Sequence, residues 1–168
     1  MNKLLRMLRH RWLDERDSAH ALPEAALQRL QARVAEGERR HGGEIRIVVE
    51  AGLPLSYLWK NLAARDRAIT LFGKLRVWDT EHNNGVLIYL LLAEHRIEIV
   101  AARGVARLVP QTHWDAVVAA LREALRAGRF EDGLMHAVEQ VDALLLAHFA
   151  LAEGAPNANE LPDRPLLG

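Results

Sequence analysis

The stretch GVLIYLLLAEHRIEIVAARG, residues 85–104, decides the fold of this chain. Residues 85–93 form an uninterrupted apolar run of large aliphatic side chains. Its length and its flanking turns predict a strand that is buried on both faces, not a helix. Glu94 and His95 connect it to a second apolar run at 96–102, which predicts an antiparallel hairpin with a tight turn. The first strand of this hairpin should therefore occupy the middle of a sheet.

The hairpin also determines which residues face one another at its open end. A two-residue turn at 94–95 would place Gly85 opposite Gly104 and Val86 opposite Arg103. Two facing glycines at a strand end fit a close approach of the backbone to a neighbouring turn or a ligand. We therefore expect a side chain at Gly85 to be poorly tolerated.

The residues before the hairpin predict a crossover connection. Residues 44–51, EIRIVVEA, alternate at first and predict a strand, while the apolar spacing of 55–75 predicts one long helix. A strand–helix–strand unit is right-handed and parallel, so 44–50 should pair parallel with 85–93. Helical stripes also occur at 23–41, 110–127 and 134–149. This order predicts an α/β fold, a three-layer α/β/α sandwich around a small mixed β-sheet.

Composition excludes several classes of protein. The chain has 168 residues, of which 50% are hydrophobic, and Lys plus Arg equals Asp plus Glu at 22 each. The balanced charge gives no overall attraction to nucleic acid or to acidic lipid, and the lack of cysteine excludes disulfides and thiolate chemistry. No signal peptide is visible, and no apolar run is long enough for a transmembrane segment. We expect a bacterial-type cytoplasmic protein.

Three parts can be distinguished along the chain. Residues 1–22 form an N-terminal amphipathic segment, 23–152 form the α/β/α domain, and 153–168 form a proline-containing tail that we expect to be flexible. Within the first part, residues 1–13 combine four basic side chains with a leucine stripe. They can be interpreted as a terminal helix packed on the domain or as an anchor for a membrane surface or partner.

The loop before the central strand is the candidate ligand-binding site. Because 44–50 should begin at the same edge as 85–93, the topology brings this loop, Glu44 and the end of the third strand together. The candidate ligand-binding residues are Asp79, Glu81, Asn83, Asn84 and Arg103. One interpretation is structural, with the asparagines shaping the turn and Arg103 paired with Asp79. The other is a site for a small anion or a divalent cation, calcium or magnesium, with Asp79 and Glu81 as the weak metal candidates. No residue is assigned a catalytic role.

Residues 75–104, LRVWDTEHNNGVLIYLLLAEHRIEIVAARG, resemble the TPM domain family. GEIRIVVE at 43–50 and LRAGRFEDGL at 125–134 extend the resemblance to about residues 40–150, and the closest likeness is to a cytoplasmic bacterial single-domain branch. The resemblance implies a Rossmann-like α/β/α sandwich. It also implies activities described for some members, acid phosphatase activity and the binding of divalent cations.

Two departures from the family pattern bear on function. Ala102 stands where that branch usually has an acid, and LVPQTHW at 108–114 has no acid where many members have one. Both changes remove oxygen ligands from the candidate edge. We therefore expect a non-enzymatic accessory or binding domain of unknown ligand, linked to a membrane-protein complex or to a stress function. Its partner would be an unknown, membrane-associated protein. The alternative is a phosphatase-like hydrolase that uses Asp79 with a divalent cation.

Overall fold

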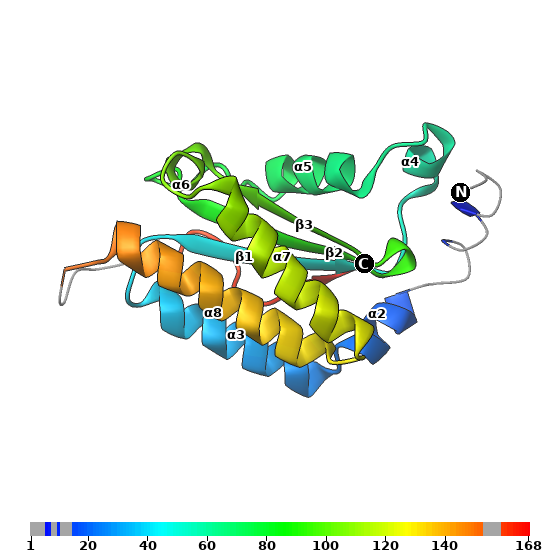
Figure 1. Cartoon of the computed structure of the whole chain (residues 1–168), viewed down its shortest axis with the longest axis horizontal. Coiled ribbons are helices and arrows are strands. Elements are labelled where there is room, and N and C mark those ends of the chain that lie inside the picture. Colours follow the sequence, from blue (N-terminus) through cyan, green and yellow to red (C-terminus); the bar gives the residue numbers. More distant parts are fainter. Residues whose placement is uncertain (1–5, 8–9, 11–14, 153–158) are drawn as a thin grey trace.

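A mixed sheet forms the middle layer of the molecule (Figure 1). The computed structural model describes residues 6–7, 10, 15–152 and 159–168. Its strands are β1 (Glu44–Glu50), β2 (Gly85–Leu91), β3 (Arg96–Ala101) and β4 (Leu166–Leu167), in the sheet order β3-β2-β1-β4. β1 is parallel to β2 and to β4, whereas β2 and β3 are antiparallel. The predicted crossover and hairpin are thus confirmed, and so is the three-layer α/β/α fold.

Helices cover both faces of the sheet (Figure 1). One face is covered by α3 (Glu24–Glu38), α7 (Gln111–Arg126) and α8 (Phe130–Phe149), and the other by α4 (Leu55–Trp59) and α5 (Ala64–Lys74). Short helices occur at α2 (Glu15–Ala21), η1 (Leu92–Glu94) and α6 (Arg103–Ala106). The two apolar cores lie between these layers and the sheet.

β2 explains why a single run of sequence decides the fold. All seven of its residues are buried. Val86, Ile88 and Leu90 contribute to the core beneath α3, α7 and α8. Leu87, Tyr89 and Leu91 contribute to the core beneath α4 and α5. A strand with helices on both faces needs apolar side chains at every position, which is why the usual alternation is absent.

The hairpin turn is longer than predicted, and the predicted register was wrong. The chain leaves β2 through the 3₁₀ turn η1 and then His95, which has the left-handed φ of 49°. Val86 consequently pairs with Ala101, not with Arg103. Gly85 does not face Gly104, because its carbonyl accepts a hydrogen bond from the backbone N–H of Ala102 at 2.8 Å. Glu94 and His95 do not have the chemistry of a two-residue turn, so they gave no reliable register.

The predicted single helix over 55–75 is instead divided into α4 and α5. Asn61 lies between them with a left-handed φ of 54°, a conformation that asparagine tolerates. The Asp66 side chain accepts a hydrogen bond from the Ala63 backbone N–H at 2.7 Å and so caps the second helix. The apolar spacing continues across this break, which is why the pattern indicated one helix.

Residues 159–168 correct the expectation of a flexible tail. Leu166 and Leu167 pair with Val48 and Val49 of β1, and Leu161 is buried in the core under α4 and α5. Few apolar side chains are needed because backbone groups also hold the segment, as where the Gly168 N–H donates to the Val49 carbonyl at 2.9 Å. The prolines and asparagines of this segment therefore concealed an ordered strand.

The N-terminal residues 1–13, interpreted as a packed terminal helix or as an anchor, lie outside the described residues except for Arg6, Met7 and His10. Met7 packs against the core under α4 and α5. Among the described residues, no helix has the length and apolar character needed to cross a bilayer.

Candidate functional site

Three chain segments meet where β1 and β2 begin, as the topology predicted. Asn84 is completely buried there, and its side-chain amide donates to the Gly42 carbonyl at 2.7 Å. Its backbone N–H donates to the Thr80 hydroxyl at 2.9 Å. On the other side, the Gly104 N–H donates to the Asn83 carbonyl at 2.9 Å. These contacts fix the loop through its backbone and one asparagine side chain.

The charged candidates of this loop lie on the surface. Asp79, Glu81, Asn83 and Arg103 are all exposed. The proposed pair of Asp79 with Arg103 is not formed, since the Asp79 carboxylate lies 3.9 Å from the Arg76 guanidinium. Both side chains of that pair are largely exposed, so its contribution to stability is small. The structure thus brings the segments together, but these exposed side chains do not form a common site.

Glu44 does reach this edge, but through the C-terminal segment. Its buried carboxylate accepts hydrogen bonds from the backbone N–H groups of Glu160 and Leu161, both at 3.2 Å. The Glu160 carboxylate in turn accepts from the Glu81 backbone N–H at 3.2 Å. Burial raises the pKa of Glu44 to about 7, although these backbone donors oppose the rise. Glu44 therefore fastens residues 160–161 to the sheet.

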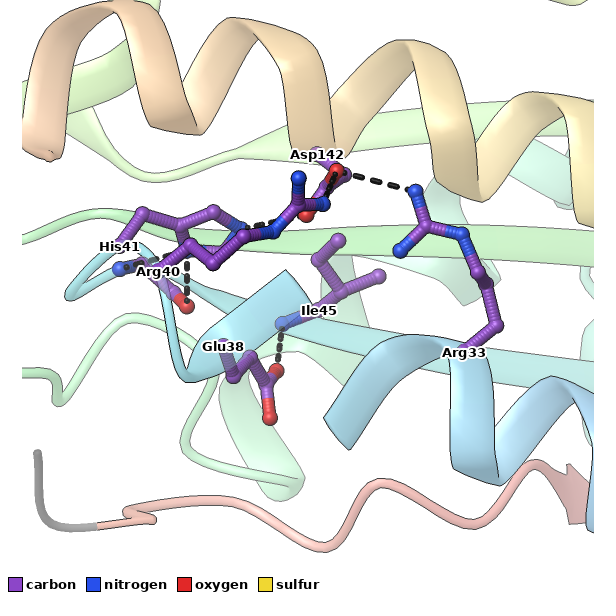
Figure 2. A network of polar contacts seen from close by, with 7 residues as sticks. Arg33, Glu38, Arg40, His41, Ile45 and Asp142 are labelled. Carbon is purple, nitrogen blue, oxygen red and sulfur yellow. Dashed lines mark hydrogen bonds and ion pairs between the residues drawn. The ribbon is translucent and has the colours of Figure 1, made fainter. Parts of the chain in front are cut away.

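A buried network that the sequence did not suggest lies between α3 and α8 (Figure 2). Asp142 of α8 accepts hydrogen bonds from Arg33 at 3.0 Å, from Arg40 at 2.6 Å and from the His41 Nε2 at 3.0 Å. His41 is completely buried and also contacts Gly43 through Nδ1. Burial lowers the pKa of His41, although the adjacent Asp142 carboxylate acts in the opposite direction. The arrangement ties the end of α3 to α8.

Glu38 forms a second buried group beside this network (Figure 2). Its carboxyl accepts a hydrogen bond from the Ile45 backbone N–H at 2.8 Å. Burial raises the pKa of Glu38 to about 9, and the nearby carboxylates of Glu44 and Asp163 add to the rise. Glu38 is therefore protonated at neutral pH.

At the opposite end of β1, Glu50 is held by two side chains from different elements. The Tyr89 hydroxyl donates to its carboxylate at 2.8 Å, and the Arg67 guanidinium forms an ion pair with it. Burial and the Glu50 carboxylate raise the pKa of Tyr89 well above its usual range. Arg67 also lies over the Tyr57 ring, 5.4 Å from its centre. This cluster joins β1 and β2 to α5.

Glu94, just after β2, binds the N-terminal segment. Its carboxylate accepts hydrogen bonds from Arg6 at 2.6 Å and lies 2.9 Å from the His10 Nε2. Burial would raise the pKa of Glu94, but the hydrogen bonds from Arg6 and His10 outweigh it and hold that pKa below its ordinary value. His10 also accepts from the Leu53 backbone N–H through Nδ1 at 2.9 Å.

The described residues contain no group of three or more histidine and acidic side chains arranged to hold a metal ion. Their buried carboxyls are instead bonded to arginines, histidines and backbone amides. A sequence signal existed only for the charged groups on β1. Glu44, Arg46 and Glu50 lie in a strand that is buried along its whole length. Charges at such positions need partners from other elements, although the sequence does not say which.

Comparisons with known proteins agree on the fold. A family model described as the TPM domain matches residues 16–144. The NMR structure of the BA42 protein from the psychrophilic bacterium Bizionia argentinensis has a TM-score of 0.75 and 24% identity, covering 86% of this chain and 94% of that one. The N-terminal domain of a protein from P. gingivalis has a TM-score of 0.64 and 20% identity, covering 80% and 84%. No curated protein sequence matches this chain.

Proposed function

The chain belongs to the TPM domain family, and from its site geometry we propose that it is a non-enzymatic binding domain. The observation that supports this proposal is that the described acidic side chains at the candidate edge form no group that could hold a metal ion. Asp79 and Glu81 are exposed, whereas Glu44 is buried and bonded to backbone amides. An edge of this kind presents a surface and does not surround a reacting group.

Metal-assisted hydrolysis of a phosphate ester would make different demands. It needs positive charge concentrated at the transferring group, commonly metal ions held by several carboxylates. Ala102 is buried at the start of α6 and supplies no oxygen ligand from its side chain. Arg103 adds a positive charge at the same edge, which opposes the binding of a cation. A weak anion site is compatible with this edge, but turnover is not expected.

A steady-state assay of the purified chain with a generic aryl phosphate tests the proposal. We expect no significant turnover with or without magnesium or calcium. The matched variants are Asp79→Asn, at the candidate edge, and Asp115→Asn, an exposed acid on α7. Metal-dependent turnover of about 1 per second would be at the low end of ordinary enzyme rates. If Asp79→Asn abolished such turnover and Asp115→Asn did not, the chain would be a hydrolase and the proposal would be wrong.

A further inference from the structure

Exposed apolar side chains are concentrated in one segment of the chain. Six large hydrophobic side chains are exposed in the described part of the chain, and four of them lie within residues 54–78. Their exposed fractions are 66% for Leu55, 69% for Trp59, 52% for Ile69 and 50% for Trp78. We name the outer surface of residues 54–78 the α4–α5 face. It forms the outer layer on that side of the sheet (Figure 1).

The two helices of this face are joined to one another. The Tyr57 hydroxyl of α4 donates to the Thr70 hydroxyl of α5 at 2.8 Å. Ile69 and Gly73 are four residues apart and so lie on one side of α5. The Trp78 indole donates to the Gly73 carbonyl at 3.3 Å, which places the ring against the end of that helix. The apolar groups are therefore held on a structured surface and not on a loose loop.

The segment that forms this face has more basic than acidic side chains. Residues 54–78 contain five basic side chains and one acidic side chain, although the whole chain has equal numbers of both. Arg67 is paired with Glu50, and the other four basic residues are exposed. Those four are Lys60, Arg65, Lys74 and Arg76. Arg65 lies 3.6 Å from Glu98 and Arg76 lies 3.9 Å from Asp79, but neither lysine forms an ion pair with a described acid.

We propose that the α4–α5 face docks on an anionic lipid surface. Tryptophan is enriched where a bilayer meets water, because its ring is apolar and its N–H remains polar. Leu55 and Ile69 would enter the boundary between headgroups and acyl chains, while Lys60 and Lys74 would contact anionic headgroups. The inference rests on the proposed function, in that it names the surface to which the binding domain attaches.

The mixture of side chains favours lipid over a protein partner. The core of a protein interface is depleted of lysine and is surrounded by a polar rim. Here lysine follows Trp59 directly, and Lys74 and Arg76 lie between the exposed Ile69 and Trp78. Such interleaving of basic and aromatic groups suits a headgroup layer, where both can be satisfied at one depth.

Co-sedimentation of the full chain with vesicles tests this inference. We expect binding to vesicles of phosphatidylcholine mixed with phosphatidylglycerol, little binding to phosphatidylcholine alone, and weakening by salt. Reversal of both lysines, Lys60→Glu with Lys74→Glu, should weaken binding at least about tenfold, since each basic group near such a surface contributes several-fold. Replacement of both tryptophans, Trp59→Ala with Trp78→Ala, should weaken it by a similar factor.

Matched variants on other surfaces control for general effects. Leu108→Ala removes an exposed apolar side chain elsewhere, and Arg126→Glu reverses an exposed charge at the end of α7. Neither should change vesicle binding. Tryptophan emission should shift to the blue with anionic vesicles, and the shift should be lost in the double tryptophan variant. Circular dichroism melts would show that the exposed substitutions leave the fold intact.

Three results would overturn the inference. The first is that the chain does not bind anionic vesicles. The second is that it binds them, but the variants of the α4–α5 face leave binding unchanged while the combined substitutions Lys3→Glu, Arg9→Glu and Arg11→Glu abolish it. The third is concentration-dependent self-association that the tryptophan variants remove without any vesicle binding, since a second copy would then be the occupant. Each result leaves the proposed non-enzymatic function standing, because only phosphate turnover contradicts that.

Discussion

Gly85 has no space for a side chain, because a Cβ atom there would lie 2.0 Å from the Val77 carbonyl oxygen. Gly85→Val should therefore lower the free energy of unfolding by about 2 kcal/mol or more, since backbone must move to relieve the clash. Urea denaturation of both proteins measures the difference. Gly73→Ala is the matched control, because a Cβ at Gly73 would meet open space and alanine favours the helix. An unchanged midpoint for Gly85→Val would show that the close approach to Val77 does not exist.

Glu38 should make stability depend on pH. Its pKa is about 9 in the folded state against an ordinary 4.5, so the folded chain keeps a proton that the unfolded chain loses. The contribution of Glu38 to stability is therefore fully present below about pH 4.5 and is lost as pH rises through about 9. Glu38→Gln resembles the protonated form at every pH, so it should not lose this contribution.

The measurement is the difference in unfolding free energy between Glu38→Gln and the unsubstituted chain. Between pH 5 and pH 9, the unsubstituted chain should lose at least about 2 kcal/mol of unfolding free energy relative to the variant. Glu36→Gln, an exposed substitution on the same helix, should show no such trend. A flat difference for Glu38→Gln would mean that Glu38 is ionised in the folded protein.

These residues show what single positions in the sequence can reveal. The sensitivity of Gly85 was predicted, but for facing Gly104, whereas the atom that excludes a side chain is the carbonyl of Val77. A glycine at a strand end indicates that another group lies close to its backbone, but the sequence does not identify that group. The environment of Glu38 was not predicted, because it depends on how the turn before β1 places Glu44 and on Asp163, which comes from a distant part of the chain.

At the scale of elements, Asp142 joins α8 to α3 through its hydrogen bonds with two arginines and a histidine. Asp142→Asn keeps the size of the side chain but removes its charge, so Arg33 and His41 lose their buried partner. We expect a loss of about 3 kcal/mol in the free energy of unfolding. Glu139→Gln is the control, since Glu139 is an exposed acid on the same helix. Equal stability of the two variants would contradict a structural role for the network.

Elements with continuous hydrophobic patterns were predicted well. β2 is apolar along its whole length, and the helix stripes of α3, α7 and α8 were all recognised from spacing. The connections were predicted less well. Asn61 divides a helix whose apolar spacing continues on both sides, and the turn ending at His95 depends on a left-handed residue that the sequence does not mark. Turn geometry depends on local backbone energies, and the spacing of hydrophobic residues carries no information about them.

At the scale of the whole molecule, residues 159–168 stabilise a sheet from which they are distant in sequence. Leu161 is buried in the core that β2 shares with α4 and α5. Leu161→Ala should therefore lower the free energy of unfolding by about 2 to 3 kcal/mol, through lost burial and the cavity left behind. Leu166→Ala is the matched control, because Leu166 is 39% exposed and its pairing uses backbone groups. Similar losses for the two variants would contradict the described docking of this segment.

The candidate site could be predicted only at the level of topology. Parallel pairing of β1 and β2 required Glu44 and the 79–84 loop to lie at one edge, and they do. The directions of Asp79 and Arg103 could not be derived, because exposed side chains are not constrained by packing. The link between Glu44 and Glu81 passes through Glu160, which belongs to a segment whose composition suggested disorder.

The position of β4 next to β1 also has a consequence for protein synthesis. β1 is made early, whereas its outer neighbour is made last among the described residues. At usual translation rates β1 waits on the order of ten seconds for that partner, with its unpaired backbone available to other strands. A nascent chain stalled before residue 159 should therefore bind chaperones more strongly than the full chain stalled on the ribosome through a linker added after Gly168. Equal binding by the two stalled chains would show that the open edge is not recognised.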